Sequence, residues 1–437
     1  MREKYTDLIL LVNPPIYDFT AYDFWLKPYG LLSAASRIAP AAQFTLFDHL
    51  DRLSPAMNSL PDFRPKNDAF SRGPFYAAPV PTPAPLSGIP RVFRRFGTPQ
   101  KFFQQFLAET PPSDFAFVQT QMTYWYLGVE EVISDLRRLW PATKIVLGGT
   151  YATICPQHAR SLGPDIVVEG SDFTSLHEIL GTQPPDAYKP PLWQLYDNLR
   201  TGVMKLTQGC PFACTYCATG QSDEAFTHRR LKDCIADLHA LLDNGATDIA
   251  FYDDALLYKP QAVFIPFLEY VLEKAIDINF HTPNALHARF LNDPLAELMV
   301  RAGFKTFYLG FESASQVWQK QTGSKVMSND LAAAVSALRK AGAEQSGIIA
   351  YEIIGHPDMD SQNLSQTMHF AHSLGIKTML ADFSPIPSTP DGERCRKWTN
   401  LDEPLNHNKT AFPIRLFGQD RINELKDLCR SLNNNLI

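Results

Sequence analysis

The chain has 437 residues, of which 45% are hydrophobic and 20% are charged, and this length predicts two or three domains. The net charge of −6 excludes the broad basic field with which nucleic-acid-binding proteins attract phosphate. No run reaches the roughly 18 apolar residues of a membrane span, and the run at residues 8–12 is too short for a signal peptide. Seven cysteines, three of them clustered, indicate a reducing cytoplasm rather than a disulfide framework.

The first 180 residues alternate apolar runs with helix-like stretches. The runs predict strands at residues 8–12, 44–48, 114–120, 144–147 and 165–168, and the stretches predict helices at 31–38 and 129–139. A continuous apolar run that ends in a turn is typical of a parallel strand buried on both faces. We therefore predict a doubly wound, Rossmann-like α/β domain whose ligand-facing loops follow the carboxyl ends of the strands.

Residues 53–100 interrupt this alternation. Ten prolines there predict an extended insertion without regular structure, about twice as long as a usual loop. Its end carries Arg91, Arg94 and Arg95, which either form a solvated basic face or bind an acidic or phosphate-bearing group. A second proline-bearing stretch, residues 181–198, predicts a linker with the domain boundary near residue 197.

A loop rich in cysteine follows the strand predicted at residues 203–206. Cys210, Cys214 and Cys217 have the spacing C-x3-C-x2-C, and Tyr216 precedes the last cysteine. Most [4Fe–4S] clusters have four cysteine ligands, so a loop that offers three thiolates leaves one iron open for another ligand. A structural zinc site is the alternative, although such sites usually show two pairs of ligands.

This loop resembles that of the radical S-adenosylmethionine (SAM) superfamily, whose signature is this spacing with an aromatic residue before the third cysteine. The resemblance implies a [4Fe–4S] cluster whose open iron binds the amino and carboxylate groups of SAM. It also implies reductive cleavage of SAM to a 5′-deoxyadenosyl radical. Six strand candidates between residues 203 and 383 fit the partial (β/α)6 TIM-type barrel of that family, which has its reactive face at the strand ends.

Polar motifs at successive strand ends also resemble SAM-binding motifs of the family. They imply a SAM site that includes Tyr216, Asp253, Asp254, Asn284, Arg289, Glu312, Ile353 and Gly355. A carboxylate at residues 253–254 suits the amino group of SAM, although an acidic pair also caps helices. In this family-like site, Asn284 would bond a ribose hydroxyl and Arg289 would bond the SAM carboxylate. Glu312 would bond ribose hydroxyls or a basic group, and residues 353–355 would lie against adenine. We expect His356 to be an ordinary loop histidine.

The first domain resembles the cobalamin-binding domain that precedes the radical SAM domain in one large subfamily. The matching segments imply a cobalamin site that includes Asn13, Thr120, Met122, Gly148, Gly149 and Thr150. The D-x-H-x-x-G motif, whose histidine binds cobalt in the mutases, is absent, since Asp48 and His49 are adjacent and no glycine follows at that spacing. His49 is therefore not expected to bind cobalt.

Together these features predict a cobalamin-binding-type domain at residues 1–180, the linker, a radical SAM barrel at 199–390, and a tail at 391–437 with one amphipathic helix near 420–432. The resemblance implies a cytoplasmic enzyme that uses cobalamin to transfer a methyl group to an unactivated carbon. The substrate would be a small-molecule or natural-product-like compound, and the electron donor a flavodoxin- or ferredoxin-type reductant. The alternatives are an enzyme without cobalamin, one that uses it for a rearrangement, cyclisation or redox step, and an iron–sulfur or zinc structural protein.

Overall fold

The computed structural model describes residues 8–39, 42–219, 225–323 and 326–436. The chain divides into two compact units. The first comprises residues 1–200, 239–246 and 402–405, and the second comprises residues 201–238, 247–401 and 406–437. Within the described ranges, no helix has the length and apolar character needed to cross a membrane.

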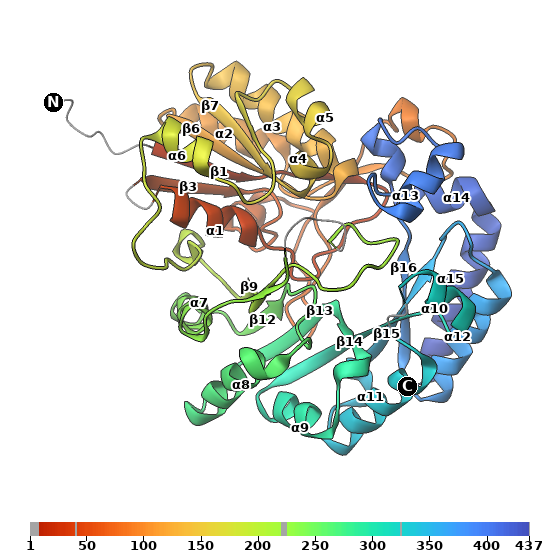
Figure 1. The fold of residues 1–437 in the computed structure, drawn as a ribbon. Coiled ribbons are helices and arrows are strands. Elements are labelled where there is room, and N and C mark those ends of the chain that lie inside the picture. The colour runs from red at the N-terminus through yellow and green to blue at the C-terminus, as the bar shows by residue number, and fades with distance from the viewer. Residues whose placement is uncertain (1–7, 40–41, 220–224, 324–325, 437) are drawn as a thin grey trace. The chain divides into compact units, whose positions relative to one another are not determined.

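A five-stranded parallel sheet with the order β3-β1-β6-β7-β8 forms the centre of the first unit (Figure 1). Its strands are β1 (Leu8–Asn13), β3 (Gln43–Asp48), β6 (Phe115–Thr120), β7 (Lys144–Gly149) and β8 (Ile166–Val168). Nearly all of β1 and all of β6 are buried, as expected for strands that are covered on both faces. The predicted doubly wound sheet is thereby confirmed.

Helices cover both faces of this sheet. They are α1 (Tyr29–Ile38), α2 (Gln100–Glu109), α3 (Tyr126–Leu139), α4 (Thr150–Ile154), α5 (Pro156–Ser161) and α6 (Thr174–Leu180). Helix α1 lies on one face and α2 and α3 on the other (Figure 1), because right-handed crossovers from β1 to β3 and from β3 to β6 run in opposite directions. The strand order therefore reverses between β1 and β6, and this switch point is where such sheets bind ligands.

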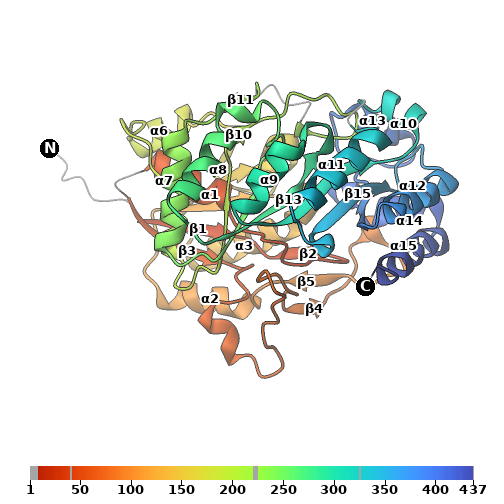
Figure 2. The same cartoon turned by 90° about the horizontal axis from the view of Figure 1, so that it is seen from below.

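The proline-rich residues 53–100 contain regular structure, contrary to the prediction. They supply β4 (Ala77–Pro79) and β5 (Arg94–Phe96), which join β2 (Ile16–Asp18) in a small antiparallel sheet of order β2-β5-β4 (Figure 2). Because β4 is an edge strand, its proline removes no hydrogen bond from the sheet interior. Arg95 is buried and donates hydrogen bonds of 2.7 and 2.8 Å to Glu131 of α3, so it belongs neither to a solvated face nor to an open anion site.

A six-stranded parallel sheet with the order β16-β15-β14-β13-β12-β9 forms the centre of the second unit. Its strands are β9 (Thr201–Met204), β12 (Asp248–Phe251), β13 (Asn279–His287), β14 (Phe304–Glu312), β15 (Ile348–Ile354) and β16 (Lys377–Asp382), and β10 (Thr207–Gln208) pairs separately with β11 (Thr227–His228). Because β9 and β16 are free edges of the sheet, the barrel is partial, as predicted. Phe251, Phe280 and Phe304 pack together with ring centroids 5.2 to 5.5 Å apart and fill the core beside three neighbouring strands.

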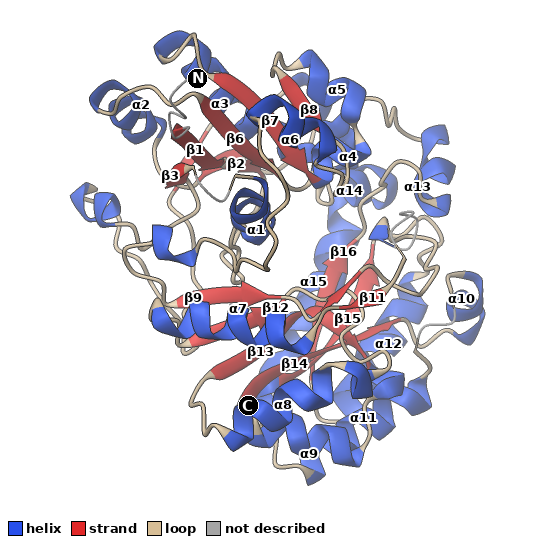
Figure 3. Ribbon diagram, turned by 60° about the vertical axis from the view of Figure 1, so that its left-hand side comes forward, coloured by secondary structure: helices blue, strands red, loops and turns tan. Residues whose placement is uncertain are grey.

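Helices lie along the outer side of this curved sheet (Figures 1 and 3). The helices of this part of the chain are α7 (Leu231–Asp243), α8 (Phe264–Glu273), α9 (Asp293–Arg301), α10 (Gln316–Gln321), α11 (Ser328–Lys340), α12 (Ser361–Ser373), α13 (Pro390–Arg394), α14 (Ala411–Phe417) and α15 (Gln419–Asn434). The helix predicted near residue 420 is α15, and it covers the edge strand β16. There the Asn433 side chain donates to the Thr378 carbonyl at 2.8 Å and accepts from the Thr378 N–H at 2.9 Å, in place of a neighbouring strand.

Candidate active site

The three cysteines lie on the loop that follows β10 in the second unit. Gly209 has a φ of 71°, a left-handed conformation that glycine adopts without strain where the chain turns into the loop. Cys214 is buried, whereas Cys210 and Cys217 are partly exposed. The Cys217 N–H donates to the Cys214 carbonyl at 3.1 Å, which folds the last two cysteines into one turn.

The three thiols lie close enough to influence one another. Burial raises the pKa of Cys210, and the charges of Cys217, Asp254 and Cys214 raise it further, against a hydrogen bond from the Phe212 backbone. Among the described residues, no three His, Cys, Asp or Glu side chains form a group that would hold a single metal ion. A [4Fe–4S] cluster does not need its ligands to converge on one point, because each cysteine binds a separate iron. Three thiols on one loop therefore fit a cluster with one open iron.

Aromatic side chains pack on both ends of the cysteine loop. Phe212 contacts His287 and Phe290, with ring centroids 4.6 and 5.9 Å apart. Tyr216 stacks on Trp318 of α10 at 5.9 Å, with only 17° between the ring planes. These contacts anchor the loop to the end of β13 and to α10.

Glu312 ends β14 in an unusual conformation. It is buried and has a φ of 66°, which is rare for a residue other than glycine and occurs often at functional sites. It lines a hollow of about 300 Å³ together with Trp318, Ile353 and His356. Two residues of the predicted SAM site, Glu312 and Ile353, are thus brought together, and the stacking partner of Tyr216 belongs to the same hollow.

The acidic pair after β12 supports the cysteine loop. Oδ1 of Asp253 accepts hydrogen bonds from the Leu206 N–H at 2.9 Å and from the Thr207 N–H and hydroxyl at 2.6 Å. Its Oδ2 is buried and has no hydrogen-bond partner among the described residues. Asp254 lies 3.4 Å from the Lys205 ammonium, and its carbonyl oxygen is 4.0 Å from Cys210 Sγ. Both aspartates are therefore next to the loop, and Asp253 shapes its beginning.

Three other residues predicted for the SAM site lie outside this hollow. Asn284 is exposed and donates to the Tyr252 carbonyl at 3.0 Å. Arg289 is exposed over the Phe290 ring and lines a different hollow, of about 710 Å³, beside α8 and α9. Gly355 has a φ of 84°, and a Cβ there would come within 2.4 Å of a Pro413 side-chain atom, so packing against α14 already requires glycine. Their roles in SAM binding stay predictions.

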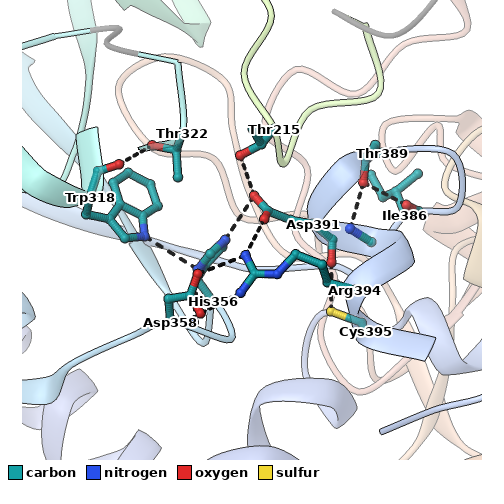
Figure 4. A network of polar contacts seen from close by, with 11 residues as sticks. Thr215, Trp318, Thr322, His356, Asp358, Ile386, Thr389, Asp391, Arg394 and Cys395 are labelled. Carbon is teal, nitrogen blue, oxygen red and sulfur yellow. Dashed lines mark hydrogen bonds and ion pairs between the residues drawn. The ribbon is translucent and has the colours of Figure 1, made fainter. Parts of the chain in front are cut away.

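Sequence reasoning missed two residues beside the cysteine loop. His356, expected to be an ordinary loop histidine, is 1% exposed, and its Nε2 lies 3.1 Å from Oδ2 of Asp391 (Figure 4). Asp391 in turn contacts Thr215, which lies between the second and third cysteines. Asp391 lies 176 residues from Thr215, so no local pattern could have indicated the contact.

A second candidate site lies at the switch point of the sheet in the first unit. A hollow there is lined by Asn13 at the end of β1, by Thr120 at the end of β6, and by Met122, which is 48% exposed. Nδ2 of Asn13 donates to Asp48 at 2.7 Å, and burial raises the pKa of Asp48 to about 6. Three residues of the predicted cobalamin site thus line one hollow.

The two glycines that end β7 are adjacent to this hollow without lining it. Gly149 has a φ of 112°, and a Cβ there would lie 2.3 Å from the Thr120 carbonyl oxygen. At Gly148, a Cβ would meet only the Cβ of Val168 at 3.8 Å, an ordinary contact. The close packing of β7 on β6 therefore requires glycine at position 149, whereas position 148 has room. Thr150 begins α4.

His49 is a core residue of the first unit. It is fully buried, with its ring 4.8 Å from that of Phe47 and 5.1 Å from that of Phe103. Burial, and then the charge of Arg95, lower the pKa of His49 well below its usual range. The ring is therefore enclosed and neutral.

Comparison with known proteins identifies the second unit. Residues 204–371 match the family model of the radical SAM superfamily, and this match contains the cysteine loop and Glu312. Residues 204–371 form a radical SAM domain. The match ends within α12, so β16 and Asp391 lie beyond the matched part of the radical SAM domain.

Two curated relatives are similar to parts of the chain. An uncharacterised methyltransferase of Pyrococcus horikoshii is 28% identical over 210 residues, which cover 47% of this chain and 43% of the relative. Bacteriochlorophyllide d C-12(1)-methyltransferase of Chlorobaculum tepidum is 27% identical over 192 residues, which cover 42% of this chain and 40% of the relative. The chain thus matches about two fifths of the length of these relatives.

Two solved structures have a similar fold over almost the whole chain. The radical SAM methyltransferase TsrM of Kitasatospora setae, with cobalamin and a [4Fe–4S] cluster bound, has a TM-score of 0.66 at 13% identity and covers 97% of this chain and 91% of its own. The cobalamin-dependent SAM radical enzyme OxsB, with aqua-cobalamin and SAM bound, has a TM-score of 0.58 at 14% identity. The similar region covers 98% of this chain and 61% of the OxsB chain. At such identities the likeness establishes the fold, with a doubly wound unit before the radical SAM domain.

Proposed function

We propose that the chain is a radical SAM enzyme in which Cys210, Cys214 and Cys217 bind a [4Fe–4S] cluster and the adjacent hollow binds SAM. One observation carries this proposal. Trp318 lines the hollow that contains Glu312 and also stacks on Tyr216 of the cysteine loop. A ligand in the hollow therefore lies beside the loop, as a molecule that binds the open iron must.

The chemistry of the hollow fits the charges of SAM. Glu312 and Asp360 line it, and their carboxylates attract the positive charge of SAM. Asp358 also lines the hollow, but both of its oxygens accept hydrogen bonds from Arg394. Ile353 supplies an apolar surface for adenine, while Asp253 and Tyr216 act on the loop rather than in the hollow. When bound, the reduced cluster and SAM supply a 5′-deoxyadenosyl radical that abstracts a hydrogen atom from the substrate.

We further infer that the first unit binds cobalamin at its switch point and that the reaction is methyl transfer to an unactivated carbon of a small molecule. Asn13, Thr120 and Met122 lie at the strand ends where sheets of this order bind ligands, which supports a cobalamin site over these strand ends. The hollow between them has a volume of only about 20 Å³, so it cannot itself enclose the cofactor. The methyltransferase names of the relatives and the cobalamin in TsrM and OxsB support the reaction. We expect the enzyme to work in the cytoplasm with a flavodoxin- or ferredoxin-type electron donor.

The cluster and SAM parts of the proposal are tested by anaerobic reconstitution. The wild-type protein should bind about four irons per chain and cleave added SAM once reduced. The variant with Cys210, Cys214 and Cys217 all changed to alanine should lose both properties. Wild-type iron and SAM cleavage in this variant would disprove the proposal.

The cobalamin part is tested separately, by the cobalamin that remains after reconstitution and desalting. Met122→Trp should fill the switch-point hollow and reduce this amount several-fold, while its iron content stays that of the wild type. Met122→Leu, which keeps the volume of the side chain, is the matched control and should retain cobalamin. Full iron with no cobalamin in the wild-type protein would leave a radical SAM enzyme with a different role for its first unit.

A further inference from the structure

Asp391 is joined to the cysteine loop by two hydrogen bonds that run in opposite directions. It lies in the first turn of α13 and is 3% exposed. Its backbone N–H donates to the Thr215 carbonyl at 3.0 Å, and the Thr215 hydroxyl donates to its Oδ2 at 2.5 Å (Figure 4). The Thr215 N–H donates to the Thr322 carbonyl at 3.3 Å. Every polar group of Thr215 is therefore engaged, and two of the three bonds are made by Asp391.

The Asp391 carboxylate is itself held from two sides. Arg394 Nη1 donates to its Oδ1 at 2.9 Å, and His356 Nε2 lies 3.1 Å from its Oδ2. Nδ1 of His356 accepts from Trp318 Nε1 at 3.4 Å and from the Asp358 N–H at 3.2 Å. Because Nδ1 accepts twice, the ring hydrogen is on Nε2, which lies within ion-pair distance of Asp391 but makes no hydrogen bond among the described residues. The carboxylate thus has a fixed orientation toward Thr215.

The same contacts reach the hollow proposed for SAM. Trp318 and His356 line that hollow, and each also contacts either the cysteine loop or a residue bonded to it. Trp318 stacks on Tyr216, whereas His356 faces Asp391. A ligand that displaces either ring changes the contacts of residues 215 and 216, which lie between two of the cysteines.

We propose that Asp391 is a positioning residue that sets the conformation of the cysteine loop between Cys214 and Cys217, and that His356 and Trp318 link this loop to the ligand in the hollow. The inference rests on the proposed function, since it takes the loop to carry the cluster. Thr215 is the only residue besides Tyr216 between these two cysteines, so its orientation controls the separation and angle of their thiols. Without the carboxylate, the Thr215 hydroxyl loses its acceptor and Arg394 loses a partner, while the backbone bond from the Asp391 N–H to the Thr215 carbonyl remains.

The test compares Thr215→Val, Thr215→Ser, Asp391→Asn and the Thr215→Val/Asp391→Asn double variant with the wild type. Three properties are measured: iron per chain after reconstitution, the electron paramagnetic resonance spectrum of the reduced cluster with and without SAM, and the melting temperature. Thr215→Val and Asp391→Asn should each shift the spectrum and weaken its response to SAM, with up to a few-fold less iron. Thr215→Ser keeps the hydroxyl and should match the wild type. The double variant should be no worse than the poorer single variant, because Thr215→Val removes and Asp391→Asn weakens the same hydrogen bond, by replacing a charged acceptor with a neutral one.

Asp248→Asn is the matched control, because it changes a second buried aspartate–histidine pair among the described residues of this unit. Asp248 begins β12, and its Oδ1 lies 3.1 Å from His281 Nε2. This variant should lower the melting temperature and leave the cluster spectrum unchanged. Wild-type spectra in Thr215→Val and Asp391→Asn, or equal changes in Asp248→Asn, would overturn the positioning role. A wild-type protein without any cluster would overturn the proposed function itself, which is a different outcome.

Discussion

Glu352 is a buried carboxyl group in the middle of a sheet. It lies in β15, is fully buried, and neither of its oxygens has a hydrogen-bond partner among the described residues. Burial raises its pKa well above the usual range, and the charge of Glu312, its register partner in β14, raises it further. The folded protein therefore keeps Glu352 protonated over a pH range in which the unfolded chain would ionise it.

We predict that Glu352→Gln makes the protein more stable than the wild type at pH 8 and has little effect at pH 4. The stabilising effect of the raised pKa is complete below the unfolded value, near 4.5. It is lost as the pH rises toward the folded value, at about 1.4 kcal/mol per pH unit. Urea unfolding at several pH values measures the difference. A constant difference between wild type and variant would show that Glu352 does not titrate in this way.

At the scale of elements, the contact between β6 and β7 explains the glycine turn of the first unit. The Thr120 hydroxyl donates to the Gly148 carbonyl at 3.0 Å, and the Ala152 N–H donates to the Thr120 hydroxyl at 3.1 Å. With Gly149 against the Thr120 carbonyl, these bonds hold the end of β7 and the start of α4 to the end of β6. Contacts between the two strand ends and α4 thus form the edge of the switch-point hollow.

We predict that alanine destabilises the protein much more at Gly149 than at the adjacent Gly148. Gly149→Ala should destabilise the protein by about 1–3 kcal/mol, because of its positive φ and the clash with Thr120. Gly148→Ala, its matched control, should cost less than about 1 kcal/mol. Chemical denaturation gives both values, and cobalamin retention is measured on each folded variant. Loss of cobalamin in Gly148→Ala at full stability would mean that position 148 contacts the ligand directly.

At the scale of the whole chain, seven cysteines divide into one group of three and four isolated thiols. The isolated residues are Cys155 between α4 and α5, Cys234 in α7, Cys395 directly after α13, and Cys429 in α15. Burial raises the pKa to about 12 for the first three of them and also raises it for Cys429. A protonated thiol without other cysteines beside it is a poor iron ligand, because the thiolate is the form that binds metal.

We therefore predict that alanine at each isolated cysteine leaves the iron content at about four per chain. Alanine at any one of Cys210, Cys214 or Cys217 should reduce the iron to a small fraction of this value. Iron and sulfide analysis after reconstitution provides the measurement, with the melting temperature as a check on folding. A wild-type cluster in Cys214→Ala would require a ligand other than the loop cysteines.

The sequence alone determined which segments form the strands of the two large parallel sheets and in what order they follow along the chain. Buried parallel strands need continuous apolar runs, so the run at residues 8–12 could be recognised without knowledge of its neighbours. The cysteine loop was equally evident, because three metal ligands on one turn must follow one another at short spacing. Features of this kind depend on residues that are close in the chain.

Only the tertiary structure decided which strand ends and loops come together. The sequence predicts that Asn284 follows its strand. In the structure, β13 instead extends to His287 through an irregular register, and Asn284 donates to the Tyr252 carbonyl. Arg289, beyond the end of this longer strand, lines another hollow. Arg95 pairs with Glu131 36 residues away, and Asp391 with Thr215 176 residues away. Charged and polar partners at such separations leave no periodic pattern in a single sequence, because their pairing is set by the packing of the strands that carry them.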